Sequence, residues 1–411
     1  MSDQEKALED RMRSLLESLG VSAEEIDRAS AEGHLYLLTV DRLLVAGVPR
    51  YTATEVAERS GMPVELTARF WRALGFTDVT DDERHFTDAD VEALTIAQRF
   101  MDEGLADVEV ALQMTRVIGL SMARVAEAEV TASPLTRNDL DPDEKADLFL
   151  RSLDVILPSI GRLLEYAWRR HLQAAFRRAM LAFSRGELSG ATIEATVGFA
   201  DLVGFTLLAQ ELSDEALAEV VSRFEALAFD TVGALGGQVV KVIGDEVMFV
   251  VRDPAEGARI ALRLADAYAD DELLSDVRVG LASGSVLAME GDYYGPVVNL
   301  ASRIVKIAIP GTVLVSDDVH AALRDDEELA FKPLRPRTLK DVGRVQLWAL
   351  HWAGTEPPSD GRWSWSRRRG LPGVLPAAAE LRARASELRD RATDRREERR
   401  EERRDRDERE E

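Results

Sequence analysis

The spacing of apolar positions predicts a helical first third of the chain. Apolar residues recur every three or four positions in "EKALEDRMRSLLESLG" and in "DVEALTIAQRFMDEGL", and the second segment follows a Thr-Asp pair of the kind that begins helices. A stretch rich in turn formers, with two prolines, follows at 131–147. We therefore expect a helical domain over 1–147. The apolar pattern of 148–188 predicts a linker helix, interrupted near Pro158 and Gly161.

A second pattern occupies 189–355, where short β-branched runs alternate with helical stretches. Their order is strand, helix, hairpin, helix, strand, which is typical of a ferredoxin-like α+β sheet, here followed by further strands. The tail at 356–411 becomes rich in Arg and Glu, a composition that predicts a solvated helix or disorder. The fold class expected for the whole chain is α+β, with an all-α domain ahead of a ferredoxin-like domain.

Composition and charge restrict the class of function. A chain of 411 residues with 45% hydrophobic content can hold two or more domains. Its formal net charge of −23 argues against general binding to nucleic acid or to an anionic membrane. The absence of cysteine excludes disulfides and thiolate metal sites. With a charged N-terminus and no apolar run of the ~20 residues that a membrane span needs, we expect a cytoplasmic protein with no transmembrane segment.

Two carboxylates occupy unusual positions in the second region. Asp201, in "VGFADLVGFT", follows an apolar run and precedes Gly204, Phe205 and Thr206, which lead into a helix whose first N–H groups suit phosphate. Asp245, in "KVIGDEVMFV", lies in the turn of a predicted hairpin. If the strands are neighbours, both carboxylates emerge at one edge of the sheet, and with phosphate oxygens they suit Mg²⁺. Each aspartate taken alone is better explained as a helix cap or turn residue.

A third segment, "GDYYGPVVNLASRIVKIA", adds an amide and a guanidinium. Asn299 and Arg303 are four residues apart at the start of a predicted helix, so both project from one face. Such a pair could orient a ribose and neutralise charge that develops on a phosphoryl group. The alternative is a helix cap followed by a surface arginine.

Together, "FADLVGFT", "KVIGDEVMFV" and "GDYYGPVVNLASR" resemble the catalytic domain of the class III nucleotidyl cyclases, in the family's order and spacing over about 190–352. The resemblance implies that Asp201 and Asp245 bind two metal ions per site, Mg²⁺ or Mn²⁺, with help from the backbone carbonyl of Leu202.

The resemblance also assigns the substrate. Lys241 would donate to ring N1 of a purine and Asp292 would accept from its exocyclic amine, which fits adenine rather than guanine. Asn299 would position the ribose, and Arg303 would stabilise the transition state. The implied reaction is attack of the ribose 3′-hydroxyl of ATP on the α-phosphorus, giving 3′,5′-cyclic AMP and pyrophosphate.

In this family the metal carboxylates come from one catalytic domain, while the purine-binding and Asn/Arg residues come from its partner. A chain that carries all six is therefore expected to form a head-to-tail homodimer with two shared sites. Family members also use a basic residue near the last strand for the triphosphate, and "TLKDVGRVQLW" offers Lys340 or Arg344.

The first region resembles the winged helix-turn-helix of MerR-type regulators over about 51–115. Residues 51–110 hold fourteen Asp/Glu against five Arg, a net charge of −9, which favours a packing module over a DNA-binding one. A helical domain joined to a cyclase domain by a helix also resembles actinobacterial class III cyclases, so we expect the first region to gate the second through 148–185. His171, among arginines, is either a pH switch or a surface residue without a role.

Three other functions compete with an adenylyl cyclase. "IGDEVMFV" is similar to the GGDEF signature of diguanylate cyclases, but it lacks the glycine pair. A transcription regulator with a nucleotide-sensing domain, or a dimerising pseudo-enzyme, would need neither both metal carboxylates nor Arg303. The intact set of six residues favours the enzyme.

Overall fold

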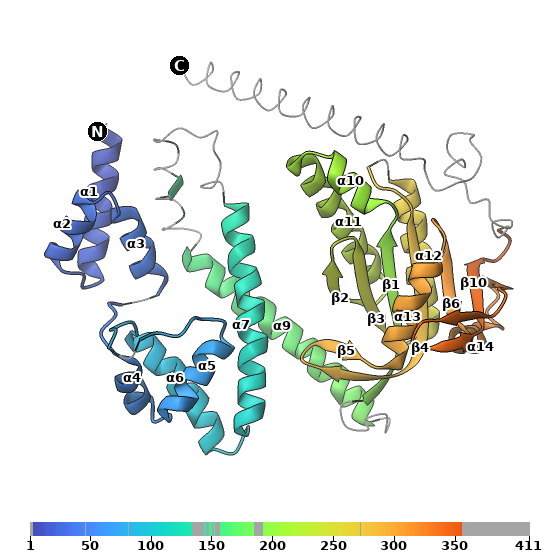
Figure 1. Ribbon diagram of the computed structural model, residues 1–411, viewed down its shortest axis with the longest axis horizontal. Coiled ribbons are helices and arrows are strands. Elements are labelled where there is room, and N and C mark those ends of the chain that lie inside the picture. Colours follow the sequence, from blue (N-terminus) through green and yellow to red (C-terminus); the bar gives the residue numbers. More distant parts are fainter. Residues whose placement is uncertain are drawn as a thin grey trace. The chain divides into compact units, whose positions relative to one another are not determined.

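The computed structural model describes residues 3–45, 47–80, 82–133, 144, 148, 149, 152, 157–184, 192–271 and 273–355. The tail expected at 356–411 and most of the loop expected at 131–147 lie outside the described residues. The chain divides into two compact units, Met1–Arg177 and Arg178–Glu411 (Figure 1). In the described part of the chain, no helix is both long and apolar enough to cross a membrane.

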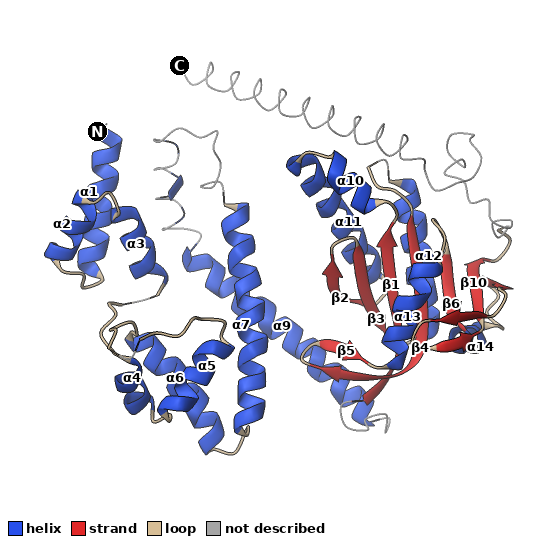
Figure 2. Ribbon diagram, in the orientation of Figure 1, coloured by secondary structure: helices blue, strands red, loops and turns tan. Residues whose placement is uncertain are grey.

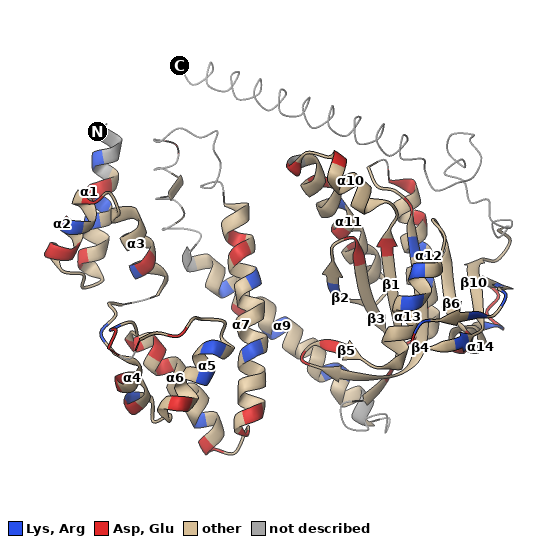
Figure 3. Ribbon diagram, viewed as in Figure 1, with Lys and Arg blue, Asp and Glu red and all other residues tan. Residues whose placement is uncertain are grey.

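The first unit is built from helices, as the apolar spacing predicts. Two clusters of buried side chains hold it together, one around Leu16 and Ile26 and the other around Val56, Phe70 and Leu112. Asp and Glu are spread along these helices (Figure 3). The helices are α1 (Asp3–Ser18), α2 (Ala23–Ala31), α3 (Leu35–Leu44), α4 (Ala53–Ser60), α5 (Val64–Ala73), α6 (Asp88–Asp102) and α7 (Val108–Ala132).

The helix starts in this unit follow from local side-chain chemistry. At α4, the Glu55 backbone N–H donates to the Thr52 hydroxyl, while the Thr52 N–H donates to the Glu55 carboxylate. At α6, the Asp90 carboxylate accepts from the Thr87 N–H at 2.7 Å. Each contact satisfies a backbone donor that the first turn leaves without a helical partner. Thr87, the threonine of the predicted start signal, is thereby the cap of α6.

The long helix α9 (Leu157–Ser184) continues through Gly161, so the interruption expected there is wrong. Most of the residues just before Leu157 lie outside the described part of the chain. Pro158 is in the first turn, where its missing N–H would have had no helical partner.

The second unit combines a mixed sheet with helices, which confirms the α+β class (Figure 2). Its strands follow the order β2-β3-β1-β4-β6-β10-β7, with β5 paired to β4 and β8 paired to β9. Its elements are β1 (Thr192–Leu202), α10 (Phe205–Glu211), α11 (Asp214–Ala234), β2 (Gln238–Ile243), β3 (Glu246–Val251), α12 (Pro254–Asp270), β4 (Val277–Met289), β5 (Asp292–Tyr294), α13 (Pro296–Ile307), β6 (Val313–Ser316), α14 (Asp317–Leu323), β7 (Leu329–Pro333), β8 (Arg337–Leu339), β9 (Gly343–Val345) and β10 (Leu347–Trp352).

The sheet separates two cores. Phe224, Phe249 and Tyr268 belong to the core beneath α11 and α12, whereas Phe199 and Ile304 belong to the core beneath α13. Strand β1 lies at the centre and is antiparallel to both β3 and β4. The eleven-residue run of β1 is therefore covered on both faces, which explains its nearly continuous apolar sequence.

Close approach of α13 to the sheet requires a glycine. A Cβ atom on Gly280 of β4 would lie 2.4 Å from the backbone nitrogen of Val305 and 2.9 Å from the carbonyl oxygen of Ala301. Neither atom can move without displacing the helix, so this glycine sets the distance between α13 and β4.

Replacing Gly280 by Ala is expected to lower the free energy of unfolding by about 1–3 kcal/mol, the usual cost of overpacking a core. Gly233→Ala is the matched control, because Gly233 lies in α11 with no atom within 4 Å of its Cβ position. That variant should be neutral or slightly more stable. Denaturant unfolding of the two variants gives the comparison, and equal stabilities would contradict the close packing at Gly280.

Candidate active site

Asp201 and Asp245 lie at the same end of neighbouring strands in the middle of the sheet. Asp201 is the penultimate residue of β1 and is 8% exposed, while Asp245 occupies the turn between β2 and β3. The two segments are joined by a hydrogen bond in which the Leu202 N–H donates to the Asp245 carbonyl oxygen at 2.9 Å. The expected convergence of the two segments is found.

A row of charged side chains crosses three strands at this end. Asp201 is directly opposite Glu246 of β3 on one side and Arg278 of β4 on the other. Directly opposed residues in antiparallel pairs share one face of the sheet, so all three point to the face that α13 covers. Arg278 Nη2 donates to Asp201 Oδ2 at 2.9 Å.

Burial disfavours the ionised form of the carboxylates in this row, so a nearby positive charge would stabilise them. Desolvation raises the pKa of Asp201, and the negative charge of Asp245 acts in the same direction, while Arg278 opposes both. Desolvation likewise raises the pKa of Glu246, with Asp201 adding to the shift. A cation held here would stabilise the ionised carboxylates, and oxygen donors suit Mg²⁺ and Mn²⁺.

The protein groups do not form a complete metal cage. Among the described residues, no cluster of three or more His, Asp or Glu side chains has an arrangement that could hold a metal ion. A divalent ion at Asp201 and Asp245 would need further oxygen ligands, which fits a site that shares its ions with a phosphorylated substrate. The residue set is therefore compatible with the expected metals.

Arg278 and Glu246 are absent from the sequence-based site. Arg278 is the single charged residue in the thirteen-residue strand β4, and this isolation in an apolar strand was a usable signal. Glu246 follows Asp245 in the chain, but only the pairing of β3 with β1 brings it opposite Asp201.

Lys241 and Asp292, the expected purine-binding pair, form an ion pair between Lys241 Nζ and Asp292 Oδ2. They come from β2 and from the start of β5, 51 positions apart in the chain. The remaining oxygen of Asp292 accepts from the Tyr293 N–H at 2.8 Å. A donor and an acceptor thus lie side by side and half exposed.

Gly204, Phe205 and Thr206 form the turn between β1 and α10. Gly204 has a φ of 78°, a left-handed conformation that favours glycine, and α10 begins at Phe205. The Leu208 N–H donates to the Gly204 carbonyl at 3.1 Å. The turn therefore directs the first N–H groups of α10 beside the end of β1, as expected from the sequence.

Asn299 and Arg303 lie on α13, apart from the carboxylates of their own chain. A Cβ atom on Gly284 would meet Val297 at 3.0 Å, and one on Gly280 would meet Val305. The helix therefore runs antiparallel to β4, and Asn299 lies over the strand between these glycines. That position is about five strand residues, or roughly 16 Å, from the level of Arg278.

Arg303 is engaged elsewhere in the same chain. Its Nη2 atom lies 3.6 Å from Oδ2 of Asp341, in the turn between β8 and β9. No hydrogen bond or ion pair within the described residues joins Asn299 or Arg303 to Asp201 or Asp245. Within one chain, the six expected residues are therefore not all brought together by direct contacts. Lys241 pairs with Asp292, and Arg303 pairs with Asp341.

The two candidate triphosphate ligands lie on the β8–β9 hairpin. Lys340 precedes Asp341 in the turn, and Arg344 is opposite Thr338 in the strand pair. Both side chains are exposed. The contact of Asp341 with Arg303 brings this hairpin to the α13 group rather than to the carboxylate row.

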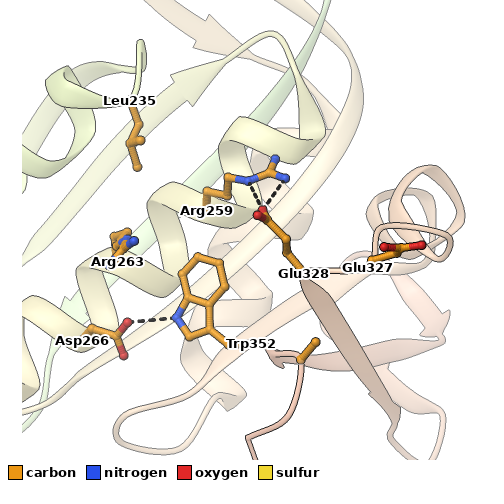
Figure 4. A pocket seen from close by; sticks show the side chains of 8 residues that line it. Leu235, Arg259, Arg263, Asp266, Glu327, Glu328 and Trp352 are labelled. Carbon is orange, nitrogen blue, oxygen red and sulfur yellow. Dashed lines mark hydrogen bonds and ion pairs between the residues drawn. The ribbon is translucent and has the colours of Figure 1, made fainter.

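A pocket of about 670 Å³ lies elsewhere in this unit, between α12 and the edge formed by β7 and β10 (Figure 4). None of the expected site residues lines it. Arg259 is paired with Glu328, and Trp352 donates to Asp266, so its polar groups largely satisfy one another.

Comparison with known proteins supplies the family. A model of the adenylate cyclase regulatory domain matches residues 4–137, and a model of the adenylate and guanylate cyclase catalytic domain matches residues 189–352.

Relatives match along most of the chain. An adenylate cyclase of Glutamicibacter nicotianae is 35% identical over 328 residues, covering 76% of this chain and 81% of that protein. An adenylate cyclase of Streptomyces coelicolor is 34% identical over 341 residues, covering 76% and 89%. A pH-sensitive adenylate cyclase of Mycobacterium tuberculosis is 34% identical over 339 residues, covering 79% and 84%.

Among solved structures, the adenylyl cyclase CyaB from P. aeruginosa matches 41% of this chain and 97% of its own, at 22% identity and a TM-score of 0.34. The two family models in tandem, together with relatives matched over most of their length, show that this chain belongs to the class III adenylate cyclases that carry an N-terminal regulatory domain.

Proposed function

We propose that the chain converts ATP to 3′,5′-cyclic AMP and pyrophosphate at two sites shared across a head-to-tail homodimer. The observation that carries this proposal is the separation of the six residues within one chain. Asp201 and Asp245 lie together, while Asn299 and Arg303 lie on α13, and Arg303 is paired with Asp341 instead. A second copy would complete each site.

The carboxylate group is the metal-binding half. Asp201, Asp245 and the carbonyl of Leu202 would hold two divalent ions, Mg²⁺ or Mn²⁺. Bound there, the ions increase the acidity of the ribose 3′-hydroxyl and offset negative charge on the phosphates. Arg278, bonded to Asp201 in the free protein, would exchange that carboxylate for a phosphate oxygen when Asp201 takes up a cation.

The second group recognises the nucleoside and the transition state. Lys241 donates to N1 of adenine, and Asp292 accepts from the 6-amino group, in place of the contact that the two side chains make with each other. Asn299 orients the ribose, so that the 3′-oxygen lies in line with the α-phosphorus. Arg303 leaves Asp341 to stabilise charge on the phosphoryl group, and Lys340 contacts the triphosphate.

Exposed apolar side chains beside Lys241 and Asp292 support the dimer. Ile243 at the end of β2 is 59% exposed, and Leu287, Met289 and Tyr294 of the β4–β5 arm are 39%, 41% and 43% exposed. Such a group of large apolar side chains is typical of a surface that a partner covers.

The helical region would control the catalytic one. We assign residues 1–147 to regulation, 148–188 to transmission and 189–355 to catalysis. Trp168, Phe176 and Met180 of α9 are each 59% exposed, which gives this helix an apolar surface that can be repacked. A site shared by two catalytic domains is active only when the domains are correctly oriented. Repacking α9 could change that orientation and so turn the activity on or off. His171 is also exposed on α9, and it is either a pH switch for this helix or a surface residue without a role.

Two inactive variants from different halves should restore activity when they are co-expressed. Asp245→Ala and Arg303→Ala are each expected to be inactive, but random pairing makes half of the dimers mixed, each with one intact site. About one quarter of wild-type cyclic AMP production should return. Co-expressing Asp201→Ala with Asp245→Ala is the control, because both changes fall in one half and no site is intact. Restoration in the control, or none in the first pair, would refute the shared site.

Asp292→Asn is expected to weaken the preference for ATP. An amide can turn its NH₂ group towards the carbonyl of guanine, whereas a carboxylate can only accept. The ratio of kcat/KM for ATP to that for GTP should fall by roughly tenfold or more. Glu290→Gln, a nearby exposed carboxylate in the β4–β5 turn, should leave the ratio unchanged. An unchanged ratio in Asp292→Asn would remove this residue from purine recognition.

Removing the helical region is expected to change the rate. Fragment 186–355 should produce cyclic AMP several-fold faster than the full chain under at least some conditions of pH and metal, because the constraint from α9 is lost. Sedimentation must first establish that both proteins are dimers at the assay concentration. Equal rates under all conditions would argue that the helical region does not gate the site.

A further inference from the structure

Helix α13 carries a third polar side chain on the face of Asn299 and Arg303. Lys306 is seven positions after Asn299 and three after Arg303, and seven residues turn an α-helix to within about 20° of the starting direction. The buried face of α13 is formed instead by Ala301, Ile304 and Val305. The side chain of Lys306 is exposed.

The register of α13 against β4 places Lys306 near the carboxylate row. Val297 lies against Gly284 and Val305 against Gly280, so the helix advances towards Arg278 as it proceeds. Lys306 is one residue, about 1.5 Å, beyond Val305, and Arg278 is two strand residues, about 6.6 Å, beyond Gly280. The Lys306 backbone therefore lies about 5 Å short of the level of the row formed by Glu246, Asp201 and Arg278, a distance that its four-carbon side chain can span.

Electrostatics supports the same position. Burial raises the pKa of Asp201 and of Glu246, and in both cases the positive charge of Lys306 opposes the shift. The ammonium group is thus within electrostatic range of both carboxylates. It forms no hydrogen bond or ion pair with any described residue, so all three of its donors remain available.

Arg278 and Lys306 differ in what they can do. The guanidinium of Arg278 is paired with Asp201 and can bind a phosphate only by giving up that contact, and its Nε atom is buried without a hydrogen-bond partner. Lys306 approaches the same region from α13, the helix that covers this face of the sheet, and its ammonium group is carried on a flexible four-carbon side chain. A polyphosphate bound at the carboxylate row carries more negative charge than two divalent ions neutralise. The ammonium group of Lys306 could contact the remaining charge.

We propose that Lys306 is a substrate-binding residue, which contacts the β- and γ-phosphate oxygens of the nucleotide bound at the carboxylates of its own protomer. The proposal rests on the proposed function, since it takes ATP as substrate and pyrophosphate as product. Helix α13 then contributes to both sites of the dimer, with Asn299 and Arg303 in one site and Lys306 in the other.

The alternative is a solvated lysine that offsets the dipole at the C-terminal end of α13. The two roles differ in what they bind. A contact to the polyphosphate affects ATP and pyrophosphate together, while a contribution to the helix end affects stability alone.

Lys306→Met, Lys306→Arg and the control Lys332→Met should be compared as full-length proteins. Lys332 lies exposed on β7 at the opposite edge of the sheet from β2, so its replacement removes one charge without touching the site. KM for ATP, kcat, and the inhibition constant of magnesium pyrophosphate are measured, and pyrophosphate binding is followed separately by calorimetry.

Lys306→Met is expected to raise KM for ATP and to weaken pyrophosphate binding by about tenfold each, the effect of losing one charge-assisted contact, with kcat within about threefold. Lys306→Arg should retain affinities within about threefold, because the charge is kept. Wild-type affinities in Lys306→Met, or equal losses in Lys332→Met, would overturn the proposal.

The calorimetric readout separates this proposal from the proposed function. If the wild type made no cyclic AMP, the proposed reaction would fail, but pyrophosphate binding would still report on Lys306. If cyclic AMP were made and pyrophosphate bound equally to wild type and Lys306→Met, the reaction would stand and Lys306 would have no part in it.

Discussion

The catalytic unit depends on a buried carboxylate at the end of its central strand. Asp201 terminates an apolar run that the two cores enclose, and it has Asp245 and Glu246 beside it. Three negative groups in a partly dehydrated place need positive charge. Arg278 supplies some of it through a direct ion pair. The same requirement explains why cations and an oxygen-rich ligand are suited to this end of the strand.

The position of α13 follows from that arrangement. Gly280 allows the helix to lie directly on β4, and the contact at Gly284 fixes its direction. The C-terminal end of the helix is thereby nearer to Asp201 than its N-terminal end. In the proposed dimer, each helix would contribute polar side chains to two sites.

The charged side chains expected to bind the nucleoside and the phosphoryl group have partners within their own chain. Lys241 is bonded to Asp292, and Arg303 is paired with Asp341. In the proposed reaction, these contacts would hold flexible side chains near the nucleotide, and they could be exchanged because the groups are partly exposed. Preorganisation of this kind reduces the conformational cost of binding.

The sequence by itself determined the classes of structure and the residues with chemistry. Apolar spacing specified helices before the sheet region, because helix and strand periods are local properties of the chain. The capping threonines and the turns at Gly204 and Gly244 are equally local, and so the positions of Asp201 and Asp245 at element ends were predictable. The continuation of α9 through Gly161 was not, since one unfavourable residue does not end a helix of 28 residues.

Tertiary structure alone decided which groups meet. Strand order brings Glu246 and Arg278 to Asp201, although they are 45 and 77 positions away in the chain, and no local pattern carries that information. The packing of α13 on Gly280 places Asn299 far from Asp201 and Lys306 nearer to it. Spacing along a helix shows which residues share a face, but only the register against β4 shows what that face meets.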